Sequence, residues 1–333
     1  MTPSGDVVSD VVRGSMESRS VDTSGLGPFR LAPWFSQRPW GRLDLRPWYN
    51  STGTTEPVGE AWLTGPECVV ETGVMAGRTL ASVATDAGER LLGAEGGTEF
   101  PLLVKLLFPN DKLSVQVHPD DAQAQAMGQP RGKTECWYVL EAAPGATIAL
   151  GLREGVTAKS VRAAVLDGTM EQLMEWVPVS VGEMIFVDAG TVHAIGPGVV
   201  LLETQQTCDI TFRLYDYGRP RELHVEQALR VMKMHTAAGK VKPVAMDGFV
   251  RLIEQKYFVV DRYEVQGAGE VVVPTEGAGC LVGLTGAAAV IGGPEGEVEL
   301  LPGQAVVVPA DRRDVIVEAA AGVSFVRCFA PAG

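Results

Sequence analysis

Long apolar runs are missing from this sequence of 333 residues. No stretch approaches the roughly 20 apolar residues that a membrane-spanning helix needs, so we expect no membrane association. Residues 1–25 are rich in Ser, Gly, Asp and Thr and lack the apolar core of a signal peptide. We interpret them as a mobile leader.

Cysteine and positive charge are also scarce. The five cysteines are odd in number and include no Cys-x-x-Cys pair, so we predict reduced thiols in a cytoplasmic protein. Lys and Arg total 28 against 41 Asp and Glu, which gives a net charge of −13. Such a surface repels nucleic acid and anionic membranes, and neither is expected as a partner. An anionic substrate would need local positive charge at its site.

Glycine and proline are frequent, at 39 and 21 residues, and they separate short runs of β-forming and other apolar residues. This pattern predicts a sandwich or barrel. Examples are the runs 102–108, 113–117, 137–140, 183–187 and 199–203. We expect helical insertions at 120–127, at 158–176 with a break near Gly168, and at 223–234. From 249 to 330 the chain is rich in Val and Gly, with almost no helical signal. The predicted division is 1–25, 26–238 and 239–333, the last a smaller all-β domain.

Residues 178–195 and 302–317 repeat one pattern of glycine turn, apolar strand, second turn and strand. The first copy resembles the second motif of cupins through Gly182, Gly190 and His193, with Asp188 where proline is usual. The later copy keeps Pro309 but has two arginines and an aspartate where the histidine would fall. The resemblance implies a jelly-roll-like cupin barrel that holds a metal, followed by a degenerate one without metal.

Four polar side chains form the candidate metal site. Alternation along 113–118 places Ser114, Gln116 and His118 on one strand face. Glu135 lies between apolar strand neighbours and is costly to bury unless paired or metal-bound. Taken singly, a strand facing water, a solvated Glu135 and a structural His193 are ordinary explanations. Together Gln116, His118, Glu135 and His193 form a mixed oxygen and nitrogen set that suits one Zn²⁺, while Fe²⁺ or Mn²⁺ also fit.

A second polar stretch follows at 201–219. On an extended chain Thr207, Asp209, Thr211 and Arg213 share a face, which either meets solvent or lines a site. Lys105 is flanked by apolar residues. Its side chain therefore either enters a cavity or extends its ammonium group to the surface while its methylene groups stay buried. The other two histidines, at positions 224 and 235, are interpreted as surface or packing residues.

Ordered motifs resemble type I mannose-6-phosphate isomerase, most closely the short bacterial form, over about residues 28–235. They are Trp40-Gly41, Gly59-Glu-Ala-Trp62, Pro101-Leu-Leu-Val-Lys-Leu-Leu107, Leu113-Ser-Val-Gln-Val-His-Pro-Asp-Asp121, Gly132-Lys-Thr-Glu-Cys-Trp-Tyr138, Gly190-Thr-Val-His-Ala-Ile-Gly196, Thr211-Phe-Arg-Leu-Tyr-Asp-Tyr217 and Arg221-Glu-Leu-His-Val-Glu-Gln-Ala-Leu229. The resemblance implies a zinc enzyme that interconverts mannose 6-phosphate and fructose 6-phosphate. We expect a monomer or a weak homodimer.

The same resemblance assigns roles to residues. Gln116, His118, Glu135 and His193 would hold one zinc ion. Arg213 matches an active-site arginine, and Lys133, Glu203 and Lys105 match polar residues of the pocket. Ser114 and Arg219 would contact phosphate. The site residues implied by the resemblance are therefore Lys105, Ser114, Gln116, His118, Lys133, Glu135, His193, Glu203, Arg213 and Arg219.

Proton transfer between two sugar carbons needs a base, an acid and positive charge near the developing oxyanion. We expect Glu203 to be the base, Lys133 to relay protons and Arg213 to stabilise the anion. Two alternatives stay open. One is a non-catalytic regulator that binds sugar phosphate. The other is a different metal-dependent cupin enzyme, such as an iron dioxygenase.

Overall fold

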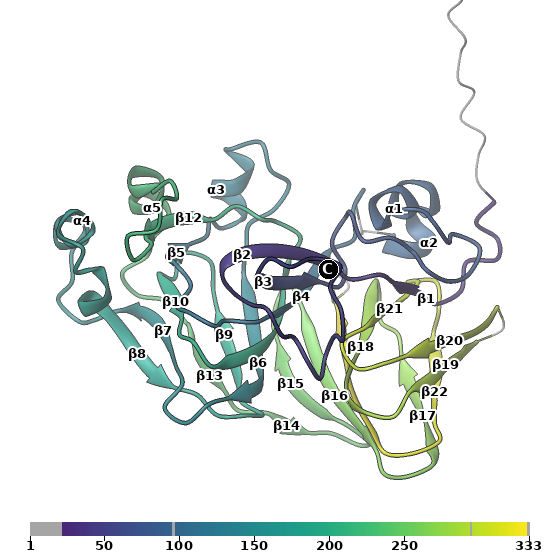
Figure 1. The fold of residues 1–333 in the computed structure, drawn as a ribbon. Coiled ribbons are helices and arrows are strands. Elements are labelled where there is room, and N and C mark those ends of the chain that lie inside the picture. Colours follow the sequence, from purple (N-terminus) through teal and green to yellow (C-terminus); the bar gives the residue numbers. More distant parts are fainter. Residues whose placement is uncertain (1–21, 95–96, 294, 332–333) are drawn as a thin grey trace, which may run out of the picture.

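The computed structural model describes residues 22–94, 97–293 and 295–331, and within these ranges the protein is mainly β (Figure 1). This confirms the predicted fold class, which is mainly β and cupin-like, with helical insertions. Residues 1–21 of the predicted leader lie outside the described residues. Within the described part of the chain, no helix is both long and apolar enough to cross a membrane.

The first sandwich pairs a seven-stranded sheet with a five-stranded sheet. The seven-stranded sheet has the order β13 (Gly239–Val241), β9 (Met184–Val187), β6 (Glu135–Ala142), β11 (Val199–Gln206), β4 (Leu102–Leu107), β3 (Val58–Trp62) and β2 (Trp34–Arg42). The five-stranded sheet has the order β12 (Phe212–Tyr215), β5 (Val115–Val117), β10 (His193–Ile195), β7 (Thr147–Leu152) and β8 (Met174–Pro178). Apolar residues of both sheets, Trp137 and Ile148 among them, form one core between them.

The second sandwich has a seven-stranded and a four-stranded sheet. The larger has the order β1 (Phe29–Leu31), β21 (Ala305–Val308), β18 (Gly279–Gly286), β23 (Val323–Phe329), β16 (Val259–Val265), β15 (Val250–Glu254) and β14 (Val244–Ala245). The smaller has the order β17 (Gly269–Pro274), β22 (Asp314–Ala319), β19 (Ala289–Gly293) and β20 (Gly296–Leu300). The two seven-stranded sheets contribute to one shared core, in which Cys136, Tyr138 and Leu202 of the first sandwich join Val260, Cys280 and Cys328 of the second. All five cysteines are free and buried.

Helices lie in all three stretches where the sequence predicts them, although they are shorter. They are α3 (Asp121–Gln125), α4 (Ala158–Asp167) and α5 (Val225–Val231). Asp120 caps α3 in a capping box, and α4 ends at Gly168, whose φ of 70° is left-handed. Residues beyond Gly168 form a 3₁₀ turn (Met170–Leu173) and then β8, so the predicted helix over 158–176 is wrong in its second half.

Two further helices, α1 (Leu80–Ala87) and α2 (Glu89–Leu92), were not predicted. Figure 1 shows them beside β1 and β21. A sequence signal for α1 exists, because Thr79 accepts a hydrogen bond from the backbone N–H of Ser82 and the buried residues Leu80, Val83, Ala84 and Ala87 follow helical spacing.

Strand pairing crosses the predicted domain boundary at 238/239. β1 pairs with β21 of the second sandwich, and β13 pairs with β9 of the first. The division into residues 26–238 and 239–333 therefore stays a prediction. The sequence repeat has a structural counterpart, because β9 and β10 lie in opposite sheets of the first sandwich and β21 and β22 in opposite sheets of the second.

Candidate active site and metal centre

The predicted metal ligands come from facing strands of the first sandwich. His193 of β10 lies directly opposite Gln116 of β5, and Glu135 starts β6 in the other sheet. Nitrogen and oxygen atoms of His118, Glu135 and His193 all lie within 4.8 Å of one another, and the three side chains are buried. Three of the four predicted ligands thus converge on one point, with Gln116 at its edge.

Both imidazoles turn their Nε2 atoms toward this point. His118 Nδ1 lies 2.8 Å from the carbonyl oxygen of Ile210, and His193 Nδ1 lies 3.0 Å from that of Thr191. A carbonyl only accepts, so each Nδ1 carries the proton and each Nε2 keeps a lone pair. Burial lowers the pKa of His193 to about 4 and that of His118 well below its usual value, so both rings are neutral at pH 7.

Glu135 supplies an anionic donor to the same point. Its Oε2 forms an ion pair of 2.8 Å with Lys133 Nζ, while among the described residues its Oε1 has no hydrogen-bond partner. Oε1 lies 3.3 Å from His193 Nε2, and Oε2 lies 3.7 Å from His118 Nε2. Two atoms bound to a tetrahedral zinc ion lie about 3.3 Å apart, given bonds of about 2.0–2.1 Å. A buried carboxylate beside two imidazole lone pairs therefore fits a divalent cation of the zinc class.

Gln116 turns its amide nitrogen toward the other donors. Its Nε2 lies 3.2 Å from His193 Nε2, and its Oε1 accepts a hydrogen bond of 3.2 Å from Ser114 Oγ. Only the amide oxygen can bind a cation, so coordination by Gln116 requires the amide to be turned by half a rotation. Lys133 also borders this point, with Nζ 2.8 Å from Glu135 Oε2 and 3.0 Å from His118 Nε2. The positive charge of its ammonium group offsets the negative charge of the buried Glu135 carboxylate.

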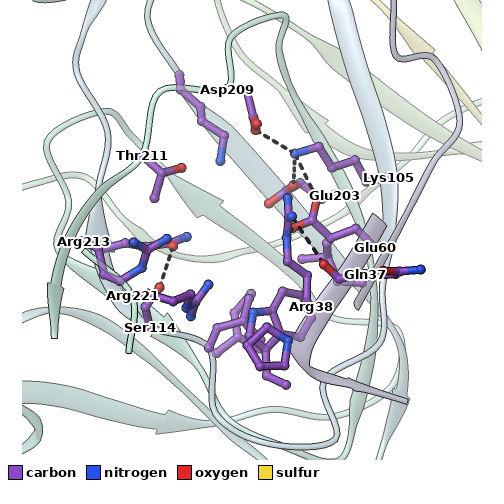
Figure 2. Close-up of a pocket in the computed structure, with 17 residues that line it drawn as sticks. Gln37, Arg38, Glu60, Lys105, Ser114, Glu203, Asp209, Thr211, Arg213 and Arg221 are labelled. Atoms are coloured by element: carbon purple, nitrogen blue, oxygen red, sulfur yellow. Dashed lines mark hydrogen bonds and ion pairs between the residues drawn. The ribbon is translucent and has the colours of Figure 1, made fainter. Parts of the chain in front are cut away.

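A cavity of about 430 Å³ opens beside these groups. Five cationic and three acidic side chains line it, a net charge of +2 in a chain of net charge −13. The eight are Arg38, Lys105, Lys133, Arg213 and Arg221 with Glu60, Glu203 and Asp209. Figure 2 shows Lys105 and its acidic partners on one side, facing Thr211, Arg213 and Arg221. The cavity therefore supplies the local positive charge that an anionic ligand needs.

Strand register places Glu203 of β11 in the cavity wall, opposite Lys105 on β4 and Trp137 on β6. Glu203 Oε1 accepts a hydrogen bond of 3.0 Å from Trp137 Nε1, and Oε2 lies 3.6 Å from Lys105 Nζ. Burial, followed by the nearby charge of Glu135, raises the pKa of Glu203. A buried carboxylate with a raised pKa is the kind of group that takes up and returns a proton.

Lys105 is buried and shared among several acids. Its Nζ lies 3.3 Å from Asp209 Oδ1 and 3.7 Å from Glu60 Oε2, in addition to the contact with Glu203. It also lies 4.5 Å from the ring centroid of Trp62. Burial lowers the pKa of this ammonium, but the surrounding carboxylates outweigh that effect and raise it overall. Lys105 therefore enters the cavity as a permanent cation, and does not reach the outer surface.

Most of the predicted substrate-facing residues line the cavity, but Arg219 does not. Ser114, Lys133 and Arg213 belong to the lining. The guanidinium of Arg219 instead pairs with Asp111 at 2.5 Å and with Asp216 at 3.0 Å. The prediction that Arg219 contacts a substrate phosphate is therefore not supported by its position. Thr207, which belongs to the predicted polar face of 207–213, does not line the cavity either. Its hydroxyl donates a hydrogen bond to the carbonyl of Phe100.

Arg38, Glu60 and Arg221 line the cavity but were not predicted. Arg38 reaches it because the register of β2 is interrupted between Gln37 and Arg42. This segment lies against Gly59, where a Cβ would come within 2.5 Å of the Cβ of Arg38. Neither the irregular strand nor the close approach follows from local sequence, although the Gly59-Glu60 motif pointed to the neighbourhood.

His224, interpreted above as a surface or packing residue, braces Arg213. The ring Nδ1 of His224 accepts a hydrogen bond of 3.2 Å from the backbone N–H of Arg213. The backbone N–H of His224 donates to the backbone carbonyl of Arg213 at 2.7 Å. The guanidinium of Arg213 donates to the carbonyl of Glu222 at 2.7 Å. Burial, then the nearby Arg221, lowers the pKa of Arg213.

Known proteins resemble this chain over most of its length. Residues 29–155 match the family described as phosphomannose isomerase type I, catalytic domain. Mannose-6-phosphate isomerase of Streptococcus mutans is 35% identical over 254 residues, which cover 72% of this chain and 80% of that protein. A probable mannose-6-phosphate isomerase of Bacillus subtilis is 35% identical over 257 residues, with the shares again 72% and 80%.

Structural comparison agrees with the sequence matches. The crystal structure of the mannose 6-phosphate isomerase from Bacillus subtilis superposes with a TM-score of 0.81 at 27% identity, and the match covers 91% of this chain and 99% of that one. The resemblance predicted from the sequence is confirmed: this chain belongs to the type I mannose-6-phosphate isomerase family.

Proposed function

We propose that this protein interconverts mannose 6-phosphate and fructose 6-phosphate with one Zn²⁺ held by Gln116, His118, Glu135 and His193. The observation that carries the proposal is the convergence of two neutral imidazoles and a buried carboxylate beside a net-positive cavity. The names of the relatives support the substrate and the reaction. The donor set and its spacing support zinc.

The cavity lining suggests how the sugar phosphate is oriented. Arg213 lies opposite Gln116 in the strand pair β12–β5, which places it beside the metal ligands. We therefore assign Arg213 to the reacting end of the sugar. Arg38 and Arg221 are the other guanidinium groups of the lining and are assigned to the phosphate, since arginine binds phosphate through paired hydrogen bonds. Lys105 and Ser114 are assigned to sugar hydroxyls.

Isomerisation moves a proton from C2 to C1 of the open-chain sugar. The four ligands would hold a divalent ion, which would supply positive charge near the carbonyl oxygen of the substrate. Glu203 removes the proton from C2, which leaves an enediolate, and returns it to C1. Lys133 passes a proton between the C2 and C1 oxygens, so that O1 gains a proton and O2 loses one. Arg213 stabilises the negative charge on the enediolate oxygen.

Removal and return of the metal tests this function directly. Incubation with a strong chelator followed by its removal is expected to abolish turnover of mannose 6-phosphate. Stoichiometric Zn²⁺ should restore it, and Mg²⁺, which prefers six oxygen ligands, should not. A coupled assay for fructose 6-phosphate measures both steps. Full turnover after complete metal removal would contradict the proposal, and binding of mannose 6-phosphate without turnover would support a regulator instead.

The assignment of Arg38 to the phosphate predicts a substrate-binding defect. Arg38→Met removes a charge-assisted contact, which contributes about 1.5–3 kcal/mol in general, so KM for mannose 6-phosphate should rise by about tenfold or more. The value of kcat should change little, because the lost contact exists before and during the chemical step. Steady-state kinetics measures both constants.

Arg42→Met is the matched control for this variant. Arg42 ends the same strand but lies outside the cavity, where its guanidinium donates to the carbonyl of Val199 and pairs with Glu141. Its KM should stay at the wild-type value. Equal KM values for the Arg38 variant and the wild type would remove Arg38 from the phosphate site.

A further inference from the structure

The segment that carries Lys133 and Glu135 is held through three consecutive backbone N–H groups. The N–H of Gly132 donates to Asp121 Oδ1 at 2.9 Å, that of Lys133 donates to the carbonyl of Pro119 at 3.0 Å, and that of Thr134 donates to Gln206 Oε1 at 3.0 Å. None of these hydrogen bonds belongs to a strand ladder. The backbone just before β6 is therefore oriented by neighbouring segments.

Asp121 connects this segment to the second sandwich. Its Oδ1 accepts from Gly132 and also from Gln206 Nε2 at 2.9 Å, and its Oδ2 accepts from the hydroxyl of Tyr257 at 2.7 Å. Tyr257 lies in the turn between β15 and β16. One carboxylate thus joins the backbone of the site, the end of β11 and a tyrosine of the second sandwich.

The contact between these segments is close. A Cβ at Gly132 would come within 2.5 Å of the backbone carbon of Asp120 and within 2.7 Å of the backbone nitrogen of Asp121. Such approaches are prohibitive, so only glycine lets the two backbones meet here. A displacement of Asp121 is consequently transmitted to Gly132, and from there to Lys133.

We propose that Tyr257 is a positioning residue which, through Asp121 and Gln206, orients the segment 132–135 so that Lys133 and Glu135 point correctly into the metal and substrate site. This inference rests on the proposed function. It gives the second sandwich a specific part in the reaction, although none of the described residues of that sandwich lines the cavity.

Within the part of the chain that the structure describes, no other side chain near Asp121 can replace the contact from Tyr257. Lys256 Nζ lies 3.9 Å from Asp121 Oδ2, but its side chain is 76% exposed. An exposed ion pair of that length contributes little. Tyr257 is only partly buried and borders a surface cavity together with Asp121 and Gln206, so removal of its hydroxyl leaves the cores of both sandwiches intact.

The decisive variant is Tyr257→Phe, which deletes only the hydroxyl. Hydrogen bonds to groups around metal ligands change metal affinity by about 10–100-fold when removed. Because Tyr257 acts through Asp121, we expect the lower end: the zinc dissociation constant, from competition with a chromophoric chelator, should rise by about tenfold. The value of kcat should fall by a similar factor, with KM nearly unchanged. Hydrogen–deuterium exchange of residues 128–136 should accelerate.

Substitutions at Asp121 separate positioning from bulk stability. Asp121→Ala removes all three hydrogen bonds and should lower zinc affinity and kcat more than Tyr257→Phe does. Asp121→Asn keeps an acceptor oxygen for Gly132 and Gln206, so its zinc affinity and kcat should be close to the wild-type values. Tyr49→Phe is the matched control, since the Tyr49 hydroxyl donates to the carbonyl of Gly303 in the second sandwich and, among the described residues, makes no hydrogen bond to the segment 132–135. It should keep wild-type zinc affinity, kcat and exchange.

The outcomes distinguish this inference from the proposed function. Wild-type protein that neither binds zinc nor turns over mannose 6-phosphate contradicts the proposed function. Wild-type protein that does both, beside a Tyr257→Phe variant with the same zinc affinity, kcat and exchange, overturns the positioning role alone. Equal losses in Tyr257→Phe and Tyr49→Phe would also overturn it, because they would show a general effect of inter-sandwich contacts.

Discussion

Glu203→Gln is expected to lower kcat for mannose 6-phosphate by about 10²–10⁴-fold, the range that a positioned general base contributes. Glutamine retains the size of the side chain and still accepts the hydrogen bond from Trp137 Nε1, but it cannot take a proton from carbon. Incorporation of deuterium from D₂O into the sugar at C1 and C2 should fall in parallel. Zinc affinity should stay near the wild-type value, because Glu203 is not a proposed ligand.

Glu60→Gln separates the loss of a base from the loss of a charge. Glu60 lines the same cavity and lies 3.7 Å from Lys105 Nζ, about the same distance as Glu203. This variant also leaves Lys105 with one carboxylate fewer, so it should show only the few-fold effect of altered charge. A Glu203→Gln variant with full turnover and unchanged deuterium exchange would eliminate Glu203 as the base.

Glu135→Gln is expected to weaken zinc binding by more than about 100-fold and to abolish turnover at ordinary zinc concentrations. Groups that only support ligands already change metal affinity by about 10–100-fold, and Glu135 is the sole anionic member of the proposed set. The buried ammonium of Lys133 would also lose its partner at 2.8 Å, which should destabilise the fold. Metal content after dialysis and the thermal midpoint measure the two effects.

Glu141→Gln controls for the same change on the same strand. Glu141 lies at the exposed end of β6, where it accepts from Trp48 Nε1 and pairs with Arg42. It should keep its metal, its turnover and its stability. Stoichiometric zinc and wild-type turnover in a folded Glu135→Gln variant would show that the ligand set is wrong.

The candidate metal site was the part of the structure that local sequence indicated best, because side-chain chemistry and strand alternation both point to it. Gln116 and His118 share a strand face, and Glu135 interrupts an apolar run where only a paired or metal-bound acid is stable. Both arguments need only local sequence. The convergence of His118, Glu135 and His193 then confirms that the facing strands meet as expected.

The arginines of the cavity could not be assigned from local sequence. Arg219 and Arg221 are two residues apart in one turn, and both pair with the buried Asp216. Which of them faces the cavity depends on the path of the turn, which spacing does not encode. Arg38 depends on the irregular pairing of β2 with β3, a feature of tertiary structure. Long-range packing decided these positions.

The predicted helix boundaries were wrong for a related reason. Apolar spacing alone suggested a helix through Trp176, but Gly168 adopts a left-handed conformation and β8 then pairs with β7. Conversely, α1 has a capping threonine and regular apolar spacing, and it was missed within a chain dominated by short strands. The contact between Tyr257 and Asp121 joins residues 136 positions apart, and no pattern in either segment predicts it.

The pairing of β1 with β21 has a consequence for the order in which the chain folds. Phe29 aligns with Val307, so one edge of this seven-stranded sheet is supplied by a strand that is synthesised long before its partner. Until residues 305–308 leave the ribosome, β1 lacks β21 and can pair only through its other edge, where Leu31 bridges to Val70. The growing polypeptide must keep the open edge of this apolar strand from pairing elsewhere. Closure of so long a loop places β1 docking among the late events of folding.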